Sequence, residues 1–116
     1  MRDFTKLRVW QKAHELALEI YRTTQQFPQD ERFGLAAHLR KTGISIVSNI
    51  AEGCGRDSDA ELVRFLSIAA GSASEAECQV LLASDLGFLS GETSNDLTNR
   101  IHEIRRMLYG FKQNLK

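Results

Sequence analysis

Proline is almost absent from this sequence, and long apolar runs are missing altogether. The only proline among 116 residues is Pro28, so hardly any position is barred from a helix interior by its backbone. No apolar stretch approaches the ~20 residues that a membrane-spanning helix needs. The first residues also lack the apolar segment of a signal peptide. These absences favour a soluble, cytoplasmic, helical protein without a membrane partner.

Cysteine is scarce as well, and the two residues present are Cys54 and Cys78. They form no CxxC motif, and neither has a histidine at metal-ligand spacing. We interpret both as reduced, structural thiols, which fits a cytoplasmic protein. A chain of this length buries a sufficient apolar core without disulfides or metals, so we expect residues 1–116 to form a single domain.

Net charge is the third absence, because 15 Lys and Arg residues balance 15 Asp and Glu residues. Bulk charge therefore predicts neither a nucleic-acid partner nor a membrane partner. The distribution along the chain is uneven, however. Residues 57–91 contain six acidic residues and a single base, Arg64, whereas the remainder contains fourteen bases and nine acids. Charge is thus partitioned between segments of the chain.

Apolar residues recur at spacings of three and four in four segments, which predicts helices over about residues 5–27, 30–52, 59–86 and 90–116. Ser58 and Glu61 form a capping box at the start of the third helix. Gly53 is placed to end the second helix as a left-handed cap. The turns between the segments are short. The pattern predicts an all-α fold, an antiparallel up-down-up-down four-helix bundle. Its steadiest seam is on the fourth helix: Leu97, Ile101, Ile104, Leu108, Phe111 and Leu115.

Small residues and a polar line mark the second and third helices. Gly43 and the run of Ala, Gly and Ser over residues 69–74 lie inside predicted helices. Since small side chains allow close helix approach, we expect these two segments to pack together. Polar residues of both helices are predicted to form a half-buried hydrogen-bonded network that sets their register; a ligand or nucleic-acid site on the same line is the alternative. The network comprises Ser45, Ser48, Asn49, Glu52, Ser72 and Glu75.

Motifs of catalysis or cofactor binding are missing from the sequence. The segment 53–55, Gly-Cys-Gly, lacks the third glycine and the preceding strand of a dinucleotide site. The acidic segment 57–61 lacks the glycine of a calcium loop. None of the three histidines follows a glutamate by three residues, as di-iron bundles require. We therefore expect no enzyme activity, no cofactor and no metal.

The fourth predicted helix carries positive charge on the side away from its apolar seam. Arginine contacts phosphate with two parallel hydrogen bonds, and tyrosine stacks on an exposed base. This face is a candidate for nucleic-acid binding, with a solvated face or an acidic partner as alternatives. Its residues are His102, Arg105, Arg106, Tyr109, Lys112 and Lys116.

Several segments resemble the four-helix bundle family of 23S ribosomal RNA intervening-sequence proteins. The most specific is Ser45-x-x-x-Asn49-Ile-Ala-Glu-Gly53, preceded by Phe27-Pro28 and by Glu-Arg-Phe-Gly-Leu at residues 31–35. Leu-x-Val-Trp-Gln-Lys-Ala at 7–13, Arg-Phe-Leu-x-Ile-Ala-x-Gly-Ser-x-x-Glu at 64–75 and Leu-Gly-Phe-Leu at 86–89 fit the same pattern. The resemblance covers essentially the whole chain. His38 and Gly43 depart from it, since many relatives carry Gln and Ala there.

The resemblance implies a homopentamer of four-helix protomers. It also implies kinship with the accessory proteins of diversity-generating retroelements, which are basic pentamers that bind nucleic acid and a reverse transcriptase. Two functions follow as hypotheses. The first is a non-enzymatic, oligomeric bundle that binds RNA or a ribonucleoprotein through basic faces, and the second is a protein–protein interaction scaffold that binds no nucleic acid.

Overall fold

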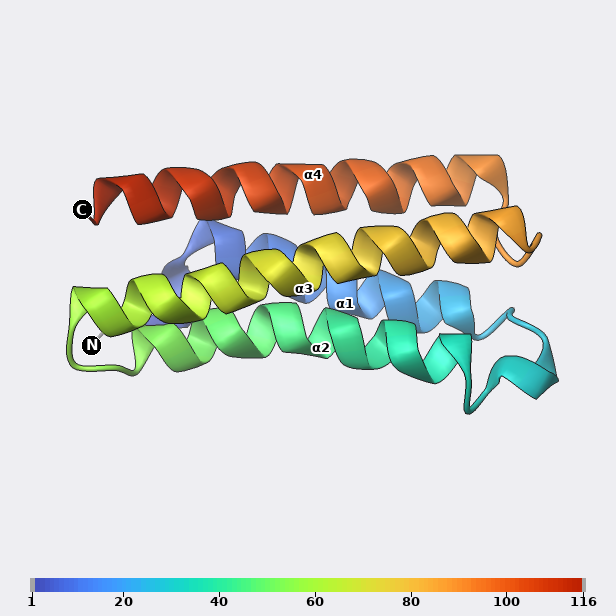
Figure 1. Cartoon of the computed structure of the whole chain (residues 1–116), viewed down its shortest axis with the longest axis horizontal. Helices are drawn as coiled ribbons and strands as arrows, with labels where there is room; N and C mark the ends of the chain where they lie inside the picture. Colours follow the sequence, from blue (N-terminus) through green and yellow to red (C-terminus); the bar gives the residue numbers. More distant parts are fainter. Residues whose placement is uncertain (1, 116) are drawn as a thin grey trace.

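The computed structural model describes residues 2–115 and contains four long helices. They are α1 (Arg8–Thr24), α2 (Leu35–Cys54), α3 (Asp59–Asp85) and α4 (Gly91–Asn114). Successive helices run in opposite directions along a molecule 43 Å long (Figure 1). Each helix packs against the next, and α1 also packs against α4, which closes the bundle. The predicted antiparallel four-helix bundle is confirmed. Within residues 2–115, no helix is both long and apolar enough to cross a membrane.

The core is made by the predicted apolar stripes. On α4, the seam residues Leu97, Ile101, Ile104 and Leu108 are all completely or almost completely buried. Burying such a side chain contributes about 1.5–3 kcal/mol, so this seam is a main source of bundle stability. The stripe of α3 is also buried but is built largely of alanine: Ala69, Ala73, Ala76 and Ala83. These short side chains let the neighbouring helices lie close to α3.

The connection between α1 and α2 differs from the sequence prediction. The second α-helix begins at Leu35, not near residue 30, and a 3-10 turn, η2 (Gln29–Glu31), precedes it. The Glu31 carboxylate accepts a hydrogen bond from the Leu35 N–H at 3.1 Å, so it caps α2 from outside the helix. Gly34 leaves room for this contact, because a Cβ at that position would lie 2.6 Å from Glu31 Oε1.

The left-handed cap predicted at Gly53 is wrong. Gly53 is buried within α2, where an added Cβ would lie 2.9 Å from both Leu62 Cδ1 and Phe65 Cβ of α3. Its role is to let α2 and α3 approach closely near their connection. The left-handed glycine is Gly87, at φ +81°, which follows α3. There the Phe88 N–H donates to the Ala83 carbonyl and the Gly87 N–H to the Ser84 carbonyl, as in a Schellman cap.

Gly43 also makes a close approach, but to a different helix from the one predicted. An added Cβ would lie 2.9 Å from Ile20 Cδ1 and 3.7 Å from Ala17 Cα, both on α1. Gly43 itself therefore faces α1, whereas the expected packing of its segment of α2 on the small residues of α3 is found two residues later, where Ser45 Oγ lies 2.8 Å from Ser72 Oγ. Gly43 and Gly53 lie ten positions apart on α2 and so serve two different neighbours.

Candidate functional site

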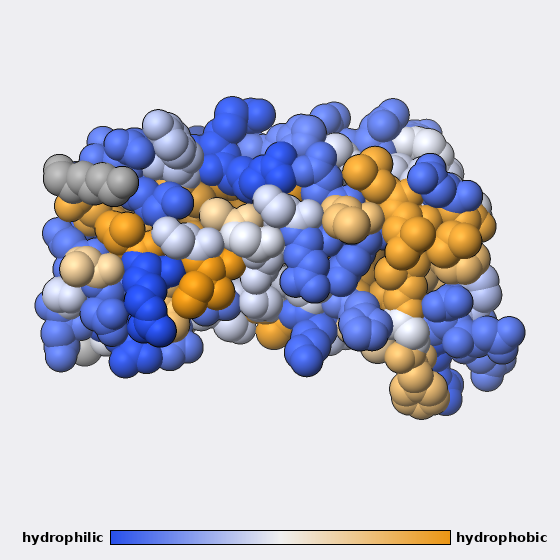
Figure 2. Space-filling model, in the orientation of Figure 1, coloured by the Kyte–Doolittle hydropathy of each residue, from blue (hydrophilic) through white to orange (hydrophobic). Residues whose placement is uncertain are grey.

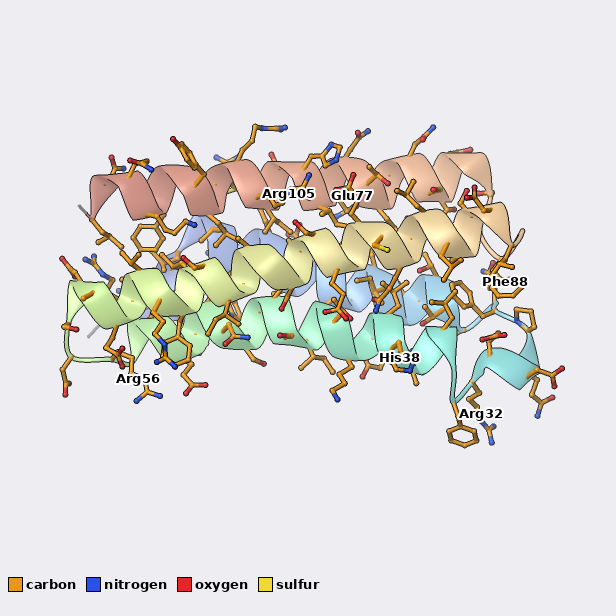
Figure 3. All side chains as sticks on the ribbon, viewed as in Figure 1. Arg32, His38, Arg56, Glu77, Phe88 and Arg105 are labelled. Atoms are coloured by element: carbon orange, nitrogen blue, oxygen red, sulfur yellow. The ribbon has the colours of Figure 1, made fainter. Side chains whose placement is uncertain are left out.

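The basic face of α4 is partly occupied by contacts with α3. Arg105 Nη1 donates to Glu77 Oε1 at 2.7 Å and to Ser74 Oγ at 3.2 Å. His102 Nε2 donates to the other oxygen of Glu77 at 2.8 Å. Figure 3 shows Arg105 and Glu77 between α4 and α3. Two of the six predicted binding residues thus tie the two helices together.

Glu77 is the centre of this cluster, and its side chain is only 23% exposed. The hydrogen bond from His102, followed by the hydrogen bond and charge of Arg105, holds the pKa of Glu77 below its usual value. The carboxylate therefore stays ionised well into the acid range and keeps both partners in place.

The other predicted α4 residues lie further out. Tyr109 is 63% exposed, and Arg106 is exposed without an ion-pair partner among the described residues. Lys112 reaches Ser67 Oγ on α3 at 3.5 Å, the long limit of a hydrogen bond. Lys116 lies outside the described residues. The part of this face that remains available for a ligand is Arg106, Tyr109 and Lys112.

The polar line of α2 joins α3 at one position. Ser45 Oγ and Ser72 Oγ share a hydrogen bond of 2.8 Å, and the Asn49 side-chain amide donates to Ser45 at its carbonyl and its hydroxyl. Glu52 instead pairs with Arg56 one turn later in the chain. The predicted partners Ser48 and Glu75 are exposed and form no side-chain hydrogen bond within residues 2–115.

The two cysteines have different surroundings. Cys54 is buried, and desolvation raises the pKa of its thiol, although the positive charge of Arg2 acts in the opposite direction. Its carbonyl accepts a hydrogen bond of 2.9 Å from the Arg2 N–H. Cys78 is exposed on α3, so it does not have the buried position expected of a structural thiol. Both are free thiols.

A second basic group was missed by sequence reasoning. Arg32, Arg40 and Lys41 lie where α1 connects to α2, and none forms an ion pair within the described part of the chain. The sequence carried a signal for it, since residues 32–51 contain these three bases and no Asp or Glu. Among residues 2–115, no three His, Cys, Asp or Glu side chains gather as metal ligands would.

The chain matches a known protein family over most of its length. The family model described as 23S rRNA-intervening sequence protein matches residues 5–110. The chain belongs to this family. A solved structure of an S23 ribosomal protein family member from Bacteroides thetaiotaomicron, described as of unknown function, is similar to this chain. The two share 25% sequence identity with a TM-score of 0.81, over 90% of this chain and 97% of the other.

A search of curated proteins gave no match to this chain. The family membership and the solved relative agree with the resemblance found in the sequence and account for the bundle.

Proposed function

We propose that this protein is a non-enzymatic, self-associating bundle of the cytoplasm that binds RNA or a ribonucleoprotein through its basic faces. The observation that carries the proposal is the group of Arg106 and Tyr109, both exposed on α4, with Lys112, which is half-buried beside Ser67 of α3. None of the three forms an ion pair with a described residue. Two cations beside an exposed aromatic ring suit a phosphate backbone with accessible bases.

RNA binding measured against salt concentration tests this proposal. Removing one cation that pairs with a phosphate should reduce the slope of log affinity against log salt by about 0.7 for a single strand. The double variant Arg106→Ala/Lys112→Ala should therefore bind more weakly and with a smaller slope. Arg100→Ala is the matched control, because Arg100 lies on α4 but pairs with Asp96 at 2.9 Å. Binding that is absent, independent of salt or equally reduced in both variants would refute RNA binding by α4.

Self-association is supported by apolar side chains on the surface of α3. Leu81, Leu82 and Leu86, at the C-terminal end of that helix, are each about half exposed. Figure 2 shows apolar residues gathered on the surface at that end of the molecule. A copy of the chain placed on this surface would remove these leucines from water, at about 25 cal/mol per Å² buried. The family resemblance implies a homopentamer, so we propose five copies.

Light scattering on a sizing column should report about five times the mass of one chain for the wild type. Leu82→Glu should yield a smaller species, because a charge would be buried at the interface. Leu18→Glu is the control, since Leu18 is 43% exposed on α1, which does not contact α3. A wild-type monomer would contradict the proposed assembly.

The exposed leucines of α3 also favour a second candidate, a protein–protein interaction scaffold that binds no nucleic acid. Under this candidate, a protein partner covers Leu82 and the neighbouring acidic residues of α3. Affinity capture before and after nuclease treatment separates the two candidates. A partner that survives nuclease and is lost in Leu82→Glu supports the scaffold, whereas a partner lost with nuclease supports RNA binding.

A further inference from the structure

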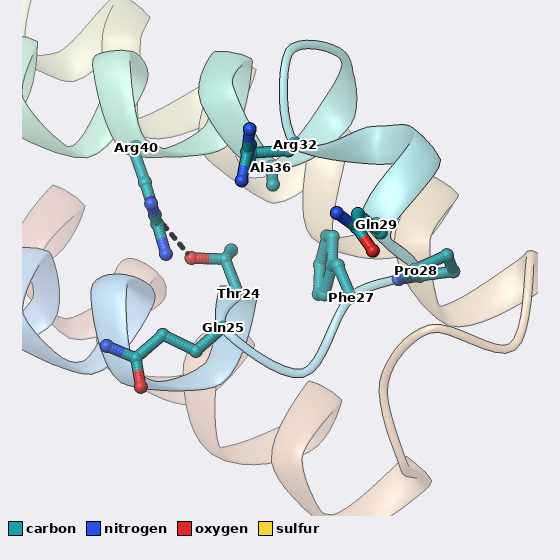
Figure 4. A pocket seen from close by; sticks show the side chains of 8 residues that line it. All are labelled: Thr24, Gln25, Phe27, Pro28, Gln29, Arg32, Ala36 and Arg40. Atoms are coloured by element: carbon teal, nitrogen blue, oxygen red, sulfur yellow. Dashed lines mark hydrogen bonds between the residues drawn. The ribbon is translucent and has the colours of Figure 1, made fainter.

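Two adjoining cavities lie where α1 turns into α2, on a different side of the bundle from the exposed α4 residues. One has a volume of about 390 Å³ and is lined by residues including Thr24, Phe27 and Gln29. The other has a volume of about 570 Å³ and is lined by residues including Tyr21, Phe33 and Lys41. Both are lined by Arg32 and Arg40. We call the two cavities together the turn cleft, and Figure 4 shows the first of them.

Arg40 is held in a fixed position at the centre of the turn cleft. Its Nε donates to Thr24 Oγ1 at 2.7 Å, and its Nη2 donates to the Tyr21 carbonyl at 3.3 Å. Thr24 is itself fixed, because its hydroxyl donates to the Ile20 carbonyl at 2.6 Å. The guanidinium also lies 4.7 Å from the centre of the Tyr21 ring. Arg40 therefore loses little side-chain freedom when a ligand binds, which favours tight binding.

The positive charge of the turn cleft is not neutralised from within the described chain. Arg32, Arg40 and Lys41 have no carboxylate partner there. The Glu31 carboxylate is engaged by the Leu35 N–H, and Asp30 is exposed in η2 without an ion pair. The first turn of α2 lines the cleft through Ala36 and Ala37 and adds the positive end of its helix dipole.

Phe33 supplies an aromatic surface at the edge of this charge. It is 84% exposed, the highest exposure among the large hydrophobic side chains that lie on the surface. The Arg32 guanidinium lies 5.1 Å from the ring centre and covers one face. Such an exposed ring contributes little to folding, because it buries almost none of its apolar surface. A planar ligand stacked on it would recover that surface.

We propose that the turn cleft binds one nucleotide unit, with its phosphate against Arg32 and Arg40 and its base stacked on Phe33. Two arginines suit a phosphate because each presents parallel N–H donors. An exposed ring beside them suits a base, since every base has a stacking face. A carboxylate-rich peptide would use the arginines but leave Phe33 uncovered. The unit is part of a single-stranded RNA, and for that source the inference rests on the proposed function.

The experiment uses three probes and three variants of the full chain. A fluorescein-labelled 12-residue oligoadenylate reports RNA affinity by anisotropy, and AMP reports the nucleotide unit by NMR shift changes, with ribose 5-phosphate as the probe without a base. Arg32→Ala removes a phosphate contact and Phe33→Ala removes the stacking surface. Arg64→Ala is the matched control, since its guanidinium also lies over a phenylalanine ring, at 5.3 Å from Phe65, but on α3.

We expect Phe33→Ala to weaken oligoadenylate binding by about 5-fold or more, the usual effect of losing one stacked base. Arg32→Ala should weaken it as well and reduce the salt slope by about 0.7. Arg64→Ala should bind like the wild type. AMP should shift the amide signals of the first turns of α2 more strongly than ribose 5-phosphate does. Both cleft residues are exposed, so circular dichroism should report unchanged folding.

The failure of this inference is distinguishable from failure of RNA binding by α4. The cleft proposal is overturned if both cleft variants bind oligoadenylate within 2-fold of wild type and AMP shifts no signal. In that case, loss of binding in Arg106→Ala/Lys112→Ala would still support RNA binding by the α4 face. If AMP binds at the cleft and oligoadenylate does not bind at all, the cleft takes a free nucleotide and the proposed RNA binding fails.

Two further outcomes would also overturn it. One is dissociation of the wild-type oligomer by Phe33→Ala, because Phe33 would then be covered by a second copy. The other is binding of a glutamate-rich peptide that depends on Arg32 when neither AMP nor oligoadenylate binds.

Discussion

Removing the charge of Glu77 should loosen the packing of α4 on α3. In Glu77→Gln the side chain keeps its shape but loses its negative charge, and only one of its two terminal atoms can still accept a hydrogen bond, so the bonds from Arg105 and His102 cannot both be kept. A hydrogen bond to a charged group contributes about 1.5–3 kcal/mol. Arg105 and His102 are 32% and 39% exposed, so solvent screening reduces this figure. We therefore expect Glu77→Gln to lower the free energy of unfolding by about 1–2 kcal/mol.

Thermal unfolding followed by circular dichroism measures this loss. For a chain of this length, about 1–2 kcal/mol corresponds to a fall in Tm of roughly 3–10 °C. Glu103→Gln is the control, because Glu103 on α4 pairs with Lys12 on α1 at 3.7 Å and both side chains are about a third or more exposed. The control should lose about 0.5 kcal/mol or less. Protein concentration must be constant, since self-association would raise Tm by mass action.

The pH dependence of Tm separates the effect of the Glu77 charge from any effect of the substitution on packing. His102 and Arg105 lower the pKa of Glu77 in the folded protein. A lowered folded-state pKa means that the carboxylate stabilises the fold above its unfolded pKa of about 4.3. This stabilisation is lost as the pH falls through the folded-state value. The difference in Tm between wild type and Glu77→Gln should therefore be full at pH 7 and narrow in acid. Equal Tm values at pH 7, or a difference unchanged in acid, would refute the reasoning.

Three further predictions concern α2 and α3. In a denaturant titration, Gly71→Ala should raise the free energy of unfolding by up to about 1 kcal/mol, because Gly71 lies inside a helix with open space around it. Gly53→Ala should lower the free energy of unfolding by about 1–3 kcal/mol in the same titration, because the added Cβ meets α3. An aromatic disulfide reagent should modify Cys78 at once and Cys54 only on unfolding, since Cys54 is buried with a raised thiol pKa; equal rates would contradict this. Gln79→Leu should stabilise the fold by about 1 kcal/mol, because Gln79 Oε1 is buried without a hydrogen-bond partner in the described chain; a loss of stability would mean that another copy supplies the partner.

The fold could be predicted because the signals that specify its helices lie between residues close together in the sequence. The seam of α4 repeats at spacings of three and four, and its residues from Leu97 to Leu108 are buried as that pattern requires. Ser58 accepts a hydrogen bond from the Glu61 N–H at the predicted start of α3. Glycine was predicted less well, because the same residue type serves as a cap and as a point of close approach. The position of Leu62 and Phe65 of α3 over Gly53 distinguishes the two roles.

The candidate site depended on contacts between helices and was therefore harder to predict. The uneven charge of the chain indicated an acidic α3 and a basic α4, but the register that places Glu77 against Arg105 is set by packing of the whole bundle. The polar line of α2 does meet Ser72 of α3, but through Ser45, whereas Asn49 bonds within α2 and Glu52 pairs with Arg56. Arg32 and Arg40 are eight residues apart, and the irregular turn before α2 brings them to one cleft.

Zero net charge does not argue against RNA binding once ion pairing is taken into account. In residues 2–115, two acids of α3 form ion pairs with bases outside that helix: Asp59 with Arg2 near the start of the chain and Glu77 with Arg105 of α4. The bases without an ion pair in this part of the chain lie in three groups: Arg32, Arg40 and Lys41 at the turn cleft, Arg106 and Lys112 on α4, and Lys6 and Arg8 at the start of α1. A phosphate within a Debye length of about 8 Å responds to these local groups and not to the total charge. Repetition of the α4 face and the turn cleft in an oligomer would raise the affinity for one RNA strand without any new contact, provided that the strand spans two copies.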